Sequence, residues 1–160
     1  MTRLAVLADI HGNLPALEAV VADIAAQAVD EVVVAGDLVG RGPQGSGVVR
    51  RIAALGWAGV RGNHEDYLLD VRAGRVPAGW GGDPAWAGAR WMADELGDDG
   101  AAFVAALPLA RVAAAAAVRI VHGTPASNRE GVGPWTDDAT LERIVADVAE
   151  PVLVGAHTHR

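Results

Sequence analysis

The stretch Leu4-Ala-Val-Leu-Ala-Asp-Ile-His-Gly-Asn13 joins a short apolar run to a polar cluster near the start of the chain. Its apolar part, Leu4 to Ala8, predicts a buried strand, and Asp9 and His11 follow that strand directly. The next residues, Leu14 to Ala28, carry apolar side chains at helical spacing, with a proline in the first turn. A strand, a polar loop and a helix in this order predict the first unit of an α/β layered fold with parallel strands.

The same order of elements returns further along the chain. Val32 to Ala35 is a β-branched run that ends at a Gly-Asp pair, and Val48 to Leu55 has a helical pattern. Trp57 to Val60 predicts a third short strand, which runs into Arg61-Gly-Asn-His64. Because ligands of open α/β sheets bind outside the carboxyl ends of the strands, we expect the polar residues after each strand to converge.

The second half of the chain is predicted from the same kinds of pattern. Gly/Pro-rich or polar segments predict loops, apolar residues at helical spacing predict helices, and short apolar runs predict strands. The expected loops are Gly74–Pro84 and Gly123–Trp135, the helices are Pro84–Leu96, Ala101–Leu107 and Thr140–Val148, and the strands are Val118–Val121 and Val152–Val154. The alanine run Ala113 to Ala117 is a poor strand by propensity and predicts the turn of a hairpin.

The composition indicates one globular domain over residues 1–160, with 51% apolar and 21% charged residues. The chain has no cysteine, which excludes disulfides and thiolate metal sites. Its N-terminal apolar run is too short for a signal peptide, and no segment suits a membrane span, so we expect a cytoplasmic protein. The net charge of −7 argues against a broad electrostatic grip on nucleic acid, but not against a local positive site.

All five histidines of the chain lie in polar clusters at the ends of predicted strands. Asp9 and His11 are two residues apart on an extended segment, which places both side chains on one side, and the same holds for the last two histidines. The carboxylate of Asp37 has two oxygens and can bridge two cations, while Asn63 offers a neutral carbonyl oxygen. The candidate metal ligands are Asp9, His11, Asp37, Asn63, His122, His157 and His159.

A mixed set of imidazole, carboxylate and amide ligands favours two borderline ions, such as manganese, iron, zinc or nickel, over magnesium alone. Two divalent ions bring about four positive charges against two carboxylates, so the site would attract a phosphate ester despite the acidic chain. A metal-bound hydroxide would then attack the phosphorus. His64 follows Asn63 and is not needed as a ligand, so it could protonate the leaving oxygen or stabilise phosphoryl charge. We therefore expect dinuclear hydrolysis of a small phosphorylated or nucleotide substrate, as a phosphomonoesterase or phosphodiesterase.

The chain also resembles the calcineurin-like metallophosphoesterase superfamily, and the stretch Asp9 to Glu18 looks like its bacterial branch of small phosphodiesterases and phosphatases. The matching blocks occur in the family's order: Asp9-x-His11, Gly36-Asp37-x-Val39-x-x-Gly42-Pro43, Gly62-Asn63-His64-Glu65, His122-Gly123 and Gly155-x-His157-x-His159. The resemblance implies a β-sandwich flanked by helices and the activity of a phosphoric ester hydrolase. It also implies ligands for two metals, with His64 as the acid or charge-stabilising histidine: Asp9, His11, Asp37 and His159 for one, and Asp37, Asn63, His122 and His157 for the other.

Three departures from the family pattern bear on these expectations. Gly40 precedes Arg41 where the protein-phosphatase branch has aspartate, which argues against a protein phosphatase and leaves Arg41 as a candidate substrate contact. Ala156 lies before His157 where the family usually has glycine, a change that the site should tolerate. Relatives usually continue beyond the position of Arg160 for several strands, so we expect a C-terminally truncated sandwich with open sheet edges, less stable or less active than an extended form.

Two other classes of function stay open at this point. A non-catalytic scaffold on the same fold would have lost its acid histidine, whereas His64 is present. A nuclease would need a basic groove, whereas the 13 arginines are scattered. Trp80, Trp86 and Trp91 either line a substrate groove or, as their spacing favours, pack in the core. The oligomeric state is not indicated, and Arg160, like Arg41, is more typical of a solvated surface charge.

Overall fold

The computed structural model describes residues 2–115 and 117–159, and the first of its two sheets carries the predicted parallel strands. The strands β1 (Leu4–Leu7), β2 (Glu31–Val34) and β3 (Ala58–Gly59) lie in that order and all pair in parallel. The register places Val6 beside Val33 and Leu7 beside Val34. All three strands were predicted, with ends that differ by at most one residue.

The second sheet contains a strand that the sequence did not indicate. The strands β4 (Ala110–Ala113), β5 (Val118–Val121) and β6 (Val152–Val154) lie in that order, with β4 antiparallel and β6 parallel to β5. The predictions of β5 and β6 are confirmed. The hairpin turn between β4 and β5 is confirmed too, since Ala114 and Ala115 have φ angles of 50° and 54°, while Ala116 lies outside the described residues.

The helices flank these sheets, and one of them was not predicted. The helices are α1 (Leu14–Ala26), α2 (Gly45–Leu55), α3 (Asn63–Arg72), α4 (Ala87–Ala106) and α5 (Asp138–Val145), with a 3-10 turn η1 (Pro84–Trp86) before α4. The unpredicted helix is α3. The two helices expected between Pro84 and Leu107 are confirmed, because α4 consists of two helical segments that meet at Gly97, whose φ of 67° and ψ of 179° are not helical.

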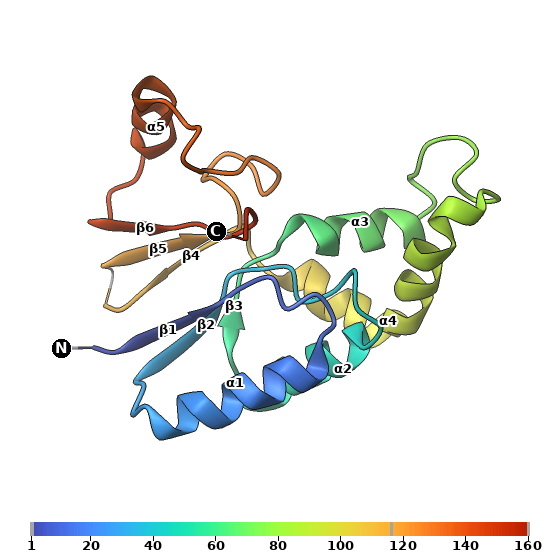
Figure 1. Cartoon of the computed structure of the whole chain (residues 1–160), viewed down its shortest axis with the longest axis horizontal. Coiled ribbons are helices and arrows are strands. Elements are labelled where there is room, and N and C mark those ends of the chain that lie inside the picture. The colour runs from blue at the N-terminus through green and yellow to red at the C-terminus, as the bar shows by residue number, and fades with distance from the viewer. Residues whose placement is uncertain (1, 116, 160) are drawn as a thin grey trace.

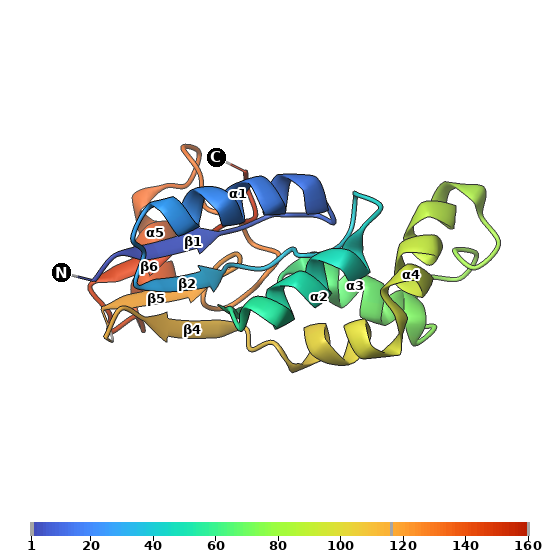
Figure 2. The same ribbon diagram turned by 90° about the horizontal axis from the view of Figure 1, so that it is seen from below.

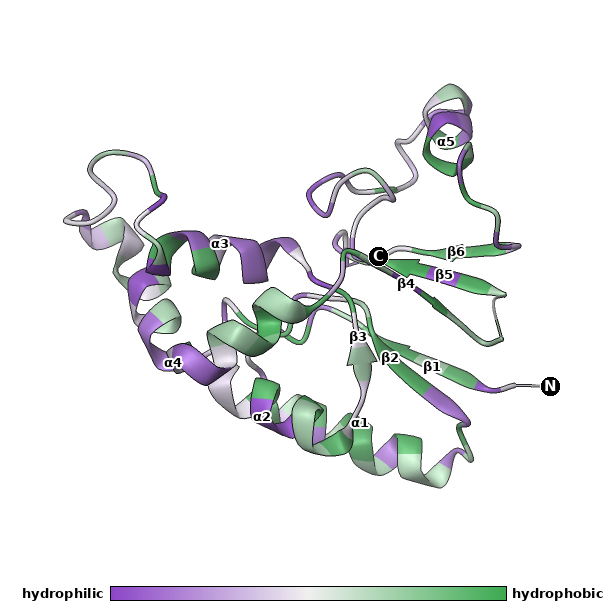
Figure 3. Ribbon diagram, turned by 180° about the vertical axis from the view of Figure 1, so that it is seen from behind, coloured by the Kyte–Doolittle hydropathy of each residue, from purple (hydrophilic) through white to green (hydrophobic). Residues whose placement is uncertain are grey.

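Alternate residues of β2 divide the hydrophobic core between its two faces. Val33 and Val34 are both fully buried. Val33 packs with Ile120 and Val118 of β5, so this cluster fills the space between the sheets. Val34 packs with Leu17 of α1 and with residues of α2, α3 and α4 on the opposite face. Figure 3 shows the resulting layers, in which the predominantly hydrophobic strands lie between α5 and α1, and Figure 2, seen from below, shows α1 in front of the strands. The expected sandwich flanked by helices is confirmed.

The strands of the first sheet and β5 and β6 all end at the same side of the molecule, where their polar loops meet (Figure 1). The antiparallel β4 begins at this side. Consequently, segments from residue 9 to residue 159 approach one another at one point. In the described part of the chain, no helix is long and apolar enough to cross a membrane.

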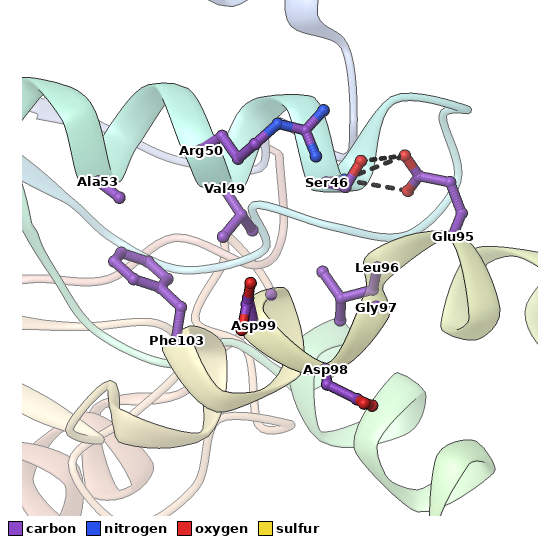
Figure 4. A pocket seen from close by; sticks show the side chains of 11 residues that line it. Ser46, Val49, Arg50, Ala53, Glu95, Leu96, Gly97, Asp98, Asp99 and Phe103 are labelled. Atoms are coloured by element: carbon purple, nitrogen blue, oxygen red, sulfur yellow. Dashed lines mark hydrogen bonds between the residues drawn. The ribbon is translucent and has the colours of Figure 1, made fainter.

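A cavity of about 350 Å³ lies elsewhere, between α2 and the kink of α4 (Figure 4). Its polar wall is explained by helix capping. Glu95 accepts a hydrogen bond from the backbone N–H of Ser46 (3.0 Å) and another from the Ser46 hydroxyl, at a helix start where Gln44 provides no side-chain cap. The lining contains none of the predicted ligands, so we assign this cavity a structural role.

Candidate metal centre

Each predicted ligand lies on a loop that follows a strand, and the structure brings all seven together. Asp9 follows β1, Asp37 follows β2, and Asn63 follows β3 and opens α3. His122 directly follows β5, and His157 follows β6. The convergence that we expected at the carboxyl ends of the strands is therefore present, although the ligands span nearly the whole chain.

Among the described residues other than glycine, five of the nine with a positive φ angle are predicted ligands. Asp9, His11, Asp37, His157 and His159 all have positive φ angles, between 50° and 68°. Residues other than glycine adopt this left-handed region at a cost of about 1–3 kcal/mol each. Strained conformations of this kind are concentrated at functional sites, so their clustering here supports a functional role for the loops.

One half of the centre is buried and contains an amide oxygen between two imidazoles. The Oδ1 atom of Asn63 lies 3.0 Å from Nε2 of His122 and 2.8 Å from Nδ1 of His157. The two imidazole nitrogens are 3.3 Å apart, and Nε2 of His122 is 3.4 Å from Oδ2 of Asp37. Nδ1 of His122 is 2.8 Å from the carbonyl oxygen of Ala35, which orients Nε2 toward the centre.

The other half is more open and contains Asp9, His11 and His159. Nε2 of His11 lies 3.3 Å from Nε2 of His159, and Nε2 of His159 lies 3.2 Å from Oδ1 of Asp9. This Asp9 oxygen is buried, its contact with His159 does not have hydrogen-bond geometry, and no other donor among the described residues reaches it. A buried carboxylate oxygen without a donor is unfavourable unless a cation balances it, so the donor set fits a bound metal ion.

Asp37 connects the two halves. Three groups of side chains could each hold a metal ion, since their candidate ligand atoms lie within 4.8 Å of one another: Asp9, His11 and His159; His11, Asp37 and His64; and Asp37, His122 and His157. Asp37 and His11 each belong to two of these groups, and the two oxygens of the Asp37 carboxylate could bridge two ions. His64 belongs to one of them, which gives it a second candidate role beside that of an acid.

The charges of the metal-free site are strongly coupled. Burial alone would raise the pKa of Asp37, but its hydrogen bond to His122 and the charge of that histidine outweigh burial and lower the pKa. Burial alone would lower the pKa of His122, yet Asp37 raises it. Burial lowers the pKa of both His11 and His64, against the opposing charge of Asp37. The lowered pKa of His11 therefore favours the neutral form, which a metal ligand requires.

Glu65 is a further residue of the site, and no role for it was predicted. Its carboxylate is fully buried and accepts hydrogen bonds from the backbone N–H groups of Asp37 (2.9 Å), Val39 (3.2 Å) and Gly62 (2.7 Å). Burial raises the pKa of Glu65 to about 7. Its place three residues after Gly62, the N-cap of α3, is the capping-box position, a signal that could have revealed both Glu65 and the helix.

Gly62 allows the backbone after β3 to approach Asp37 closely. A Cβ atom at Gly62 would overlap Oδ1 and the backbone nitrogen of Asp37. Because the φ of Gly62 is −89°, the requirement for glycine comes from contact and not from backbone strain. The backbone N–H of His64 donates to the same Oδ1 atom over 2.9 Å, so this segment fixes Asp37 from two directions.

Arg41, the predicted substrate contact, lies at the edge of the centre. It lines an open cavity of about 600 Å³ together with Asp9 and His11, and its charge lowers the pKa of both His11 and His64. The tryptophans lie elsewhere. The rings of Trp80 and Trp86 are half-buried and stack with their centroids 3.5 Å apart, which supports packing. Trp91 is 51% exposed, so the expectation that it packs in the core is wrong.

Comparison with known proteins agrees with this geometry. The sequence model of the calcineurin-like phosphoesterases matches residues 2–160. An uncharacterized protein of Methanocaldococcus jannaschii, MJ0912, is 38% identical over 68 residues, which are 42% of this chain and 28% of that protein. The structure of a metallophosphoesterase from Sphaerobacter thermophilus superposes with a TM-score of 0.79 at 26% identity, covering 99% of this chain and 61% of the other.

Two further solved structures share the fold. A putative diadenosine tetraphosphatase superposes with a TM-score of 0.61 at 27% identity, over 86% of this chain and 54% of that one. The hypothetical protein PH1004 from Pyrococcus horikoshii superposes with a TM-score of 0.78 at 23% identity, over 98% of this chain and 69% of that one. The chain thus spans about three fifths of the Sphaerobacter protein's length. From the match over residues 2–160 and the convergence of the ligands, this chain belongs to the calcineurin-like phosphoesterase family.

Proposed function

We propose that the protein hydrolyses phosphate esters with the help of two metal ions, on a small phosphorylated or nucleotide substrate. The observation that carries this proposal is the position of Asp37, whose Oδ2 atom lies 3.4 Å from Nε2 of His122 in one ligand set and 3.7 Å from Nε2 of His11 in the other. Membership of the calcineurin-like phosphoesterase family supports the reaction class.

The residues present fit two ions of the borderline class. Asp9, His11, Asp37 and His159 would hold one, and Asp37, Asn63, His122 and His157 would hold the other; imidazole, carboxylate and amide atoms suit manganese, iron, zinc or nickel. When bound, such ions lower the pKa of a coordinated water and withdraw charge from the phosphoryl oxygens.

The chain's own contribution begins with orientation of these ligands. Glu65 holds the backbone of Asp37, and the carbonyl of Ala35 fixes the ring of His122. Ligands held in this way need no rearrangement when substrate arrives, which lowers the free-energy cost of reaching the transition state.

We infer that His64 acts as the proton donor. Its ring is half-buried and meets the ring of His11 edge to face, with centroids 4.7 Å apart. A proton on His64 would pass to the ester oxygen as the bond to phosphorus breaks, and the leaving group would depart as a neutral alcohol. Arg41, exposed on the same rim, would neutralise a phosphoryl oxygen.

The choice of a nucleotide-type substrate is supported by one neighbour. A solved structure described as a putative diadenosine tetraphosphatase shares 27% identity over 86% of this chain. The positive charge that two ions would leave on the site also suits a phosphate ester, although the chain as a whole carries −7.

The proposal is tested by assaying chelator-treated protein after addition of Mn²⁺, Fe²⁺, Zn²⁺ or Ni²⁺. We expect turnover of p-nitrophenyl phosphate, bis(p-nitrophenyl) phosphate or both, abolished by EDTA and by Asp37→Asn. Asp23→Asn is the matched control, because Asp23 is an exposed carboxylate on α1. If no metal restores turnover of either ester to folded protein, the proposal is wrong.

A further inference from the structure

A row of contacts leads outward from His64 to an arginine of the loop between β5 and α5. The ring of His64 meets the ring of Tyr67 edge to face, with centroids 5.6 Å apart. The guanidinium carbon of Arg129 lies over the Tyr67 ring, 4.8 Å from its centroid. Arg129 is thus one aromatic ring away from the side chain that we assign as the proton donor.

The loop that carries Arg129 is fixed on both sides of this residue. Before it, the side-chain amide of Asn128 donates to Asp66 Oδ2 over 2.8 Å. After it, Gly131 lies against the metal-ligand loop, because a Cβ atom there would come within 3.2 Å of His157 Cδ2 and overlap Thr158 Cγ2. The guanidinium is therefore presented by a backbone that contacts both α3 and a candidate metal ligand.

The carboxylates beside Arg129 are engaged by other partners. Asp66 pairs with Arg61 at 3.0 Å and also accepts the hydrogen bond from Asn128. Glu130 pairs with Arg143 at 2.8 Å. Among residues 2–115 and 117–159, no carboxylate forms an ion pair with Arg129, and its side chain is exposed. Its positive charge is available to a ligand.

Tyr67 gives this cation a defined orientation. A guanidinium lying over an aromatic face is attracted to the ring and held parallel or inclined to it, while its N–H groups stay free at the edge. Arginine presents these groups as a fork that matches the oxygens of a phosphate or carboxylate. The Tyr67 residue is itself 44% exposed, so the pair is open to solvent and to ligand.

We propose that Arg129, held by Tyr67, binds a second anionic group on the leaving side of the substrate, which makes organic diphosphates such as nucleoside diphosphates preferred over phosphate esters with an uncharged leaving group. The inference rests on the proposed function, because His64 marks the leaving side only if it protonates the leaving oxygen. The leaving group must then lie beside His64, and Tyr67 and Arg129 are the next side chains in that row.

The test compares ADP with p-nitrophenyl phosphate in metal-loaded protein, as the ratio of the two kcat/KM values. Each variant's ratio is divided by the wild-type ratio, which removes the difference in intrinsic reactivity between the two substrates. Arg129→Gln should lower the ratio by about 10- to 100-fold, the range of a charge-assisted hydrogen bond. Raised ionic strength should lower the ratio of the wild type more than that of this variant.

Substitutions of Arg129 and Tyr67 test separately the charge of the guanidinium and its orientation. Arg129→Lys keeps the charge but loses the planar fork, so it should retain only part of the preference. Tyr67→Phe keeps the ring and should keep the ratio, whereas Tyr67→Leu should lower it. Arg75→Gln, which removes a guanidinium that is 65% exposed at the far end of α3, is the matched control and should change neither rate.

The outcomes are distinguishable from those of the proposed function. If the wild type hydrolyses neither ester with any metal, the proposed function fails and this inference falls with it. If the wild type hydrolyses both and Arg129→Gln lowers the two values of kcat/KM equally, the inference alone is overturned. The same conclusion follows if Tyr67→Leu leaves the ratio unchanged while Arg129→Lys abolishes it, since the ring would then have no part in holding the cation.

Discussion

The carboxylate of Glu65 accepts a hydrogen bond from the backbone N–H of Asp37 over 2.9 Å, in the interior of the protein. Asp37 belongs to two candidate metal groups, and its φ of 53° lies in a region that costs energy for aspartate. Glu65 therefore holds the central ligand in a conformation that the isolated chain would avoid. Glu65 contacts the backbone N–H group of Asp37 and not its carboxylate, so it positions this ligand without taking up a metal-binding position itself.

Metal-free protein should lose stability as the pH rises toward neutrality because of Glu65. Its pKa is 4.5 in the unfolded reference and about 7 in the folded protein. Between these values the unfolded chain gives up the proton while the folded protein keeps it, so the free energy of unfolding falls through this window and levels off above it. The total fall is roughly 3 kcal/mol, at about 1.4 kcal/mol per pKa unit.

Urea unfolding in EDTA between pH 4.5 and 8 measures this contribution. Glu65→Gln should be less stable than the wild type at pH 5 and should lack the slope, while Glu18→Gln, at an exposed carboxylate on α1, should keep it. Asp37 affects stability in a different pH range. Because its pKa is lowered in the folded protein, its contribution to the free energy of unfolding is lost only below pH 3.8, the ordinary pKa of aspartate. A slope in Glu65→Gln equal to that of the wild type contradicts the assignment.

Whether an element could be predicted depends on whether its sequence has a recognisable pattern. β2 and β5 are apolar, β-branched runs whose burial the pattern reveals. β4 is mostly exposed and contains Arg111 among alanines, so it has no apolar run to detect. α3, from Asn63 to Arg72, has polar residues at most of its positions, and its first turn is stabilised by Glu65. Such elements depend on tertiary contacts that composition does not record.

The candidate site divides in the same way. The convergence of the seven candidate ligands and His64 was predictable, because metal-capable residues followed strands in a recurrent order. The positive φ angles, the buried hydrogen bonds of Glu65 and the stacking of Arg129 on Tyr67 were not, since each requires segments that are distant in sequence to be placed in contact. Cation–π pairs between residues 62 positions apart leave no local pattern.

Binding of a suitable divalent metal should raise the melting temperature of the protein. Metal bound only by the folded state stabilises it by about 2.7 kcal/mol when the free metal is at 100 times its Kd. For a chain of this size, that corresponds to a shift of roughly 5–10 °C. Differential scanning fluorimetry with Mn²⁺ or Zn²⁺, before and after EDTA, measures the shift.

Variants connect this shift to the centre. Asp37→Asn and His122→Ala should lose most of the metal-induced shift, whereas Asp23→Asn should keep it. An equal shift in all three variants would place the stabilising metal away from the candidate centre.

Replacing His64 by asparagine should lower kcat by about 100-fold or more, the range of general acid catalysis, with the metal content unchanged. The reason is that the seven other side chains complete both ligand sets without it. Elemental analysis of the purified variant is the deciding measurement, because His64 also lies in a group with His11 and Asp37 that could hold an ion. Loss of one metal together with activity would make His64 a ligand instead of the acid.

Gly62→Ala should disrupt the centre through a single added methyl group. The new Cβ would overlap Oδ1 and the backbone nitrogen of Asp37, and these atoms cannot yield, because Oδ1 accepts from His64 N–H and the nitrogen donates to Glu65. We expect a loss of stability of about 1–3 kcal/mol and loss of the metal-induced shift in melting temperature.

Gly88→Ala is the matched control: Gly88 lies in α4 with open space around its Cβ position, so alanine should be neutral or should stabilise by roughly 0.5–1 kcal/mol. Thermal melts of both variants, with and without metal, decide the matter. Retention of the full metal response in Gly62→Ala would mean that Asp37 is not held against residue 62 in the functional state.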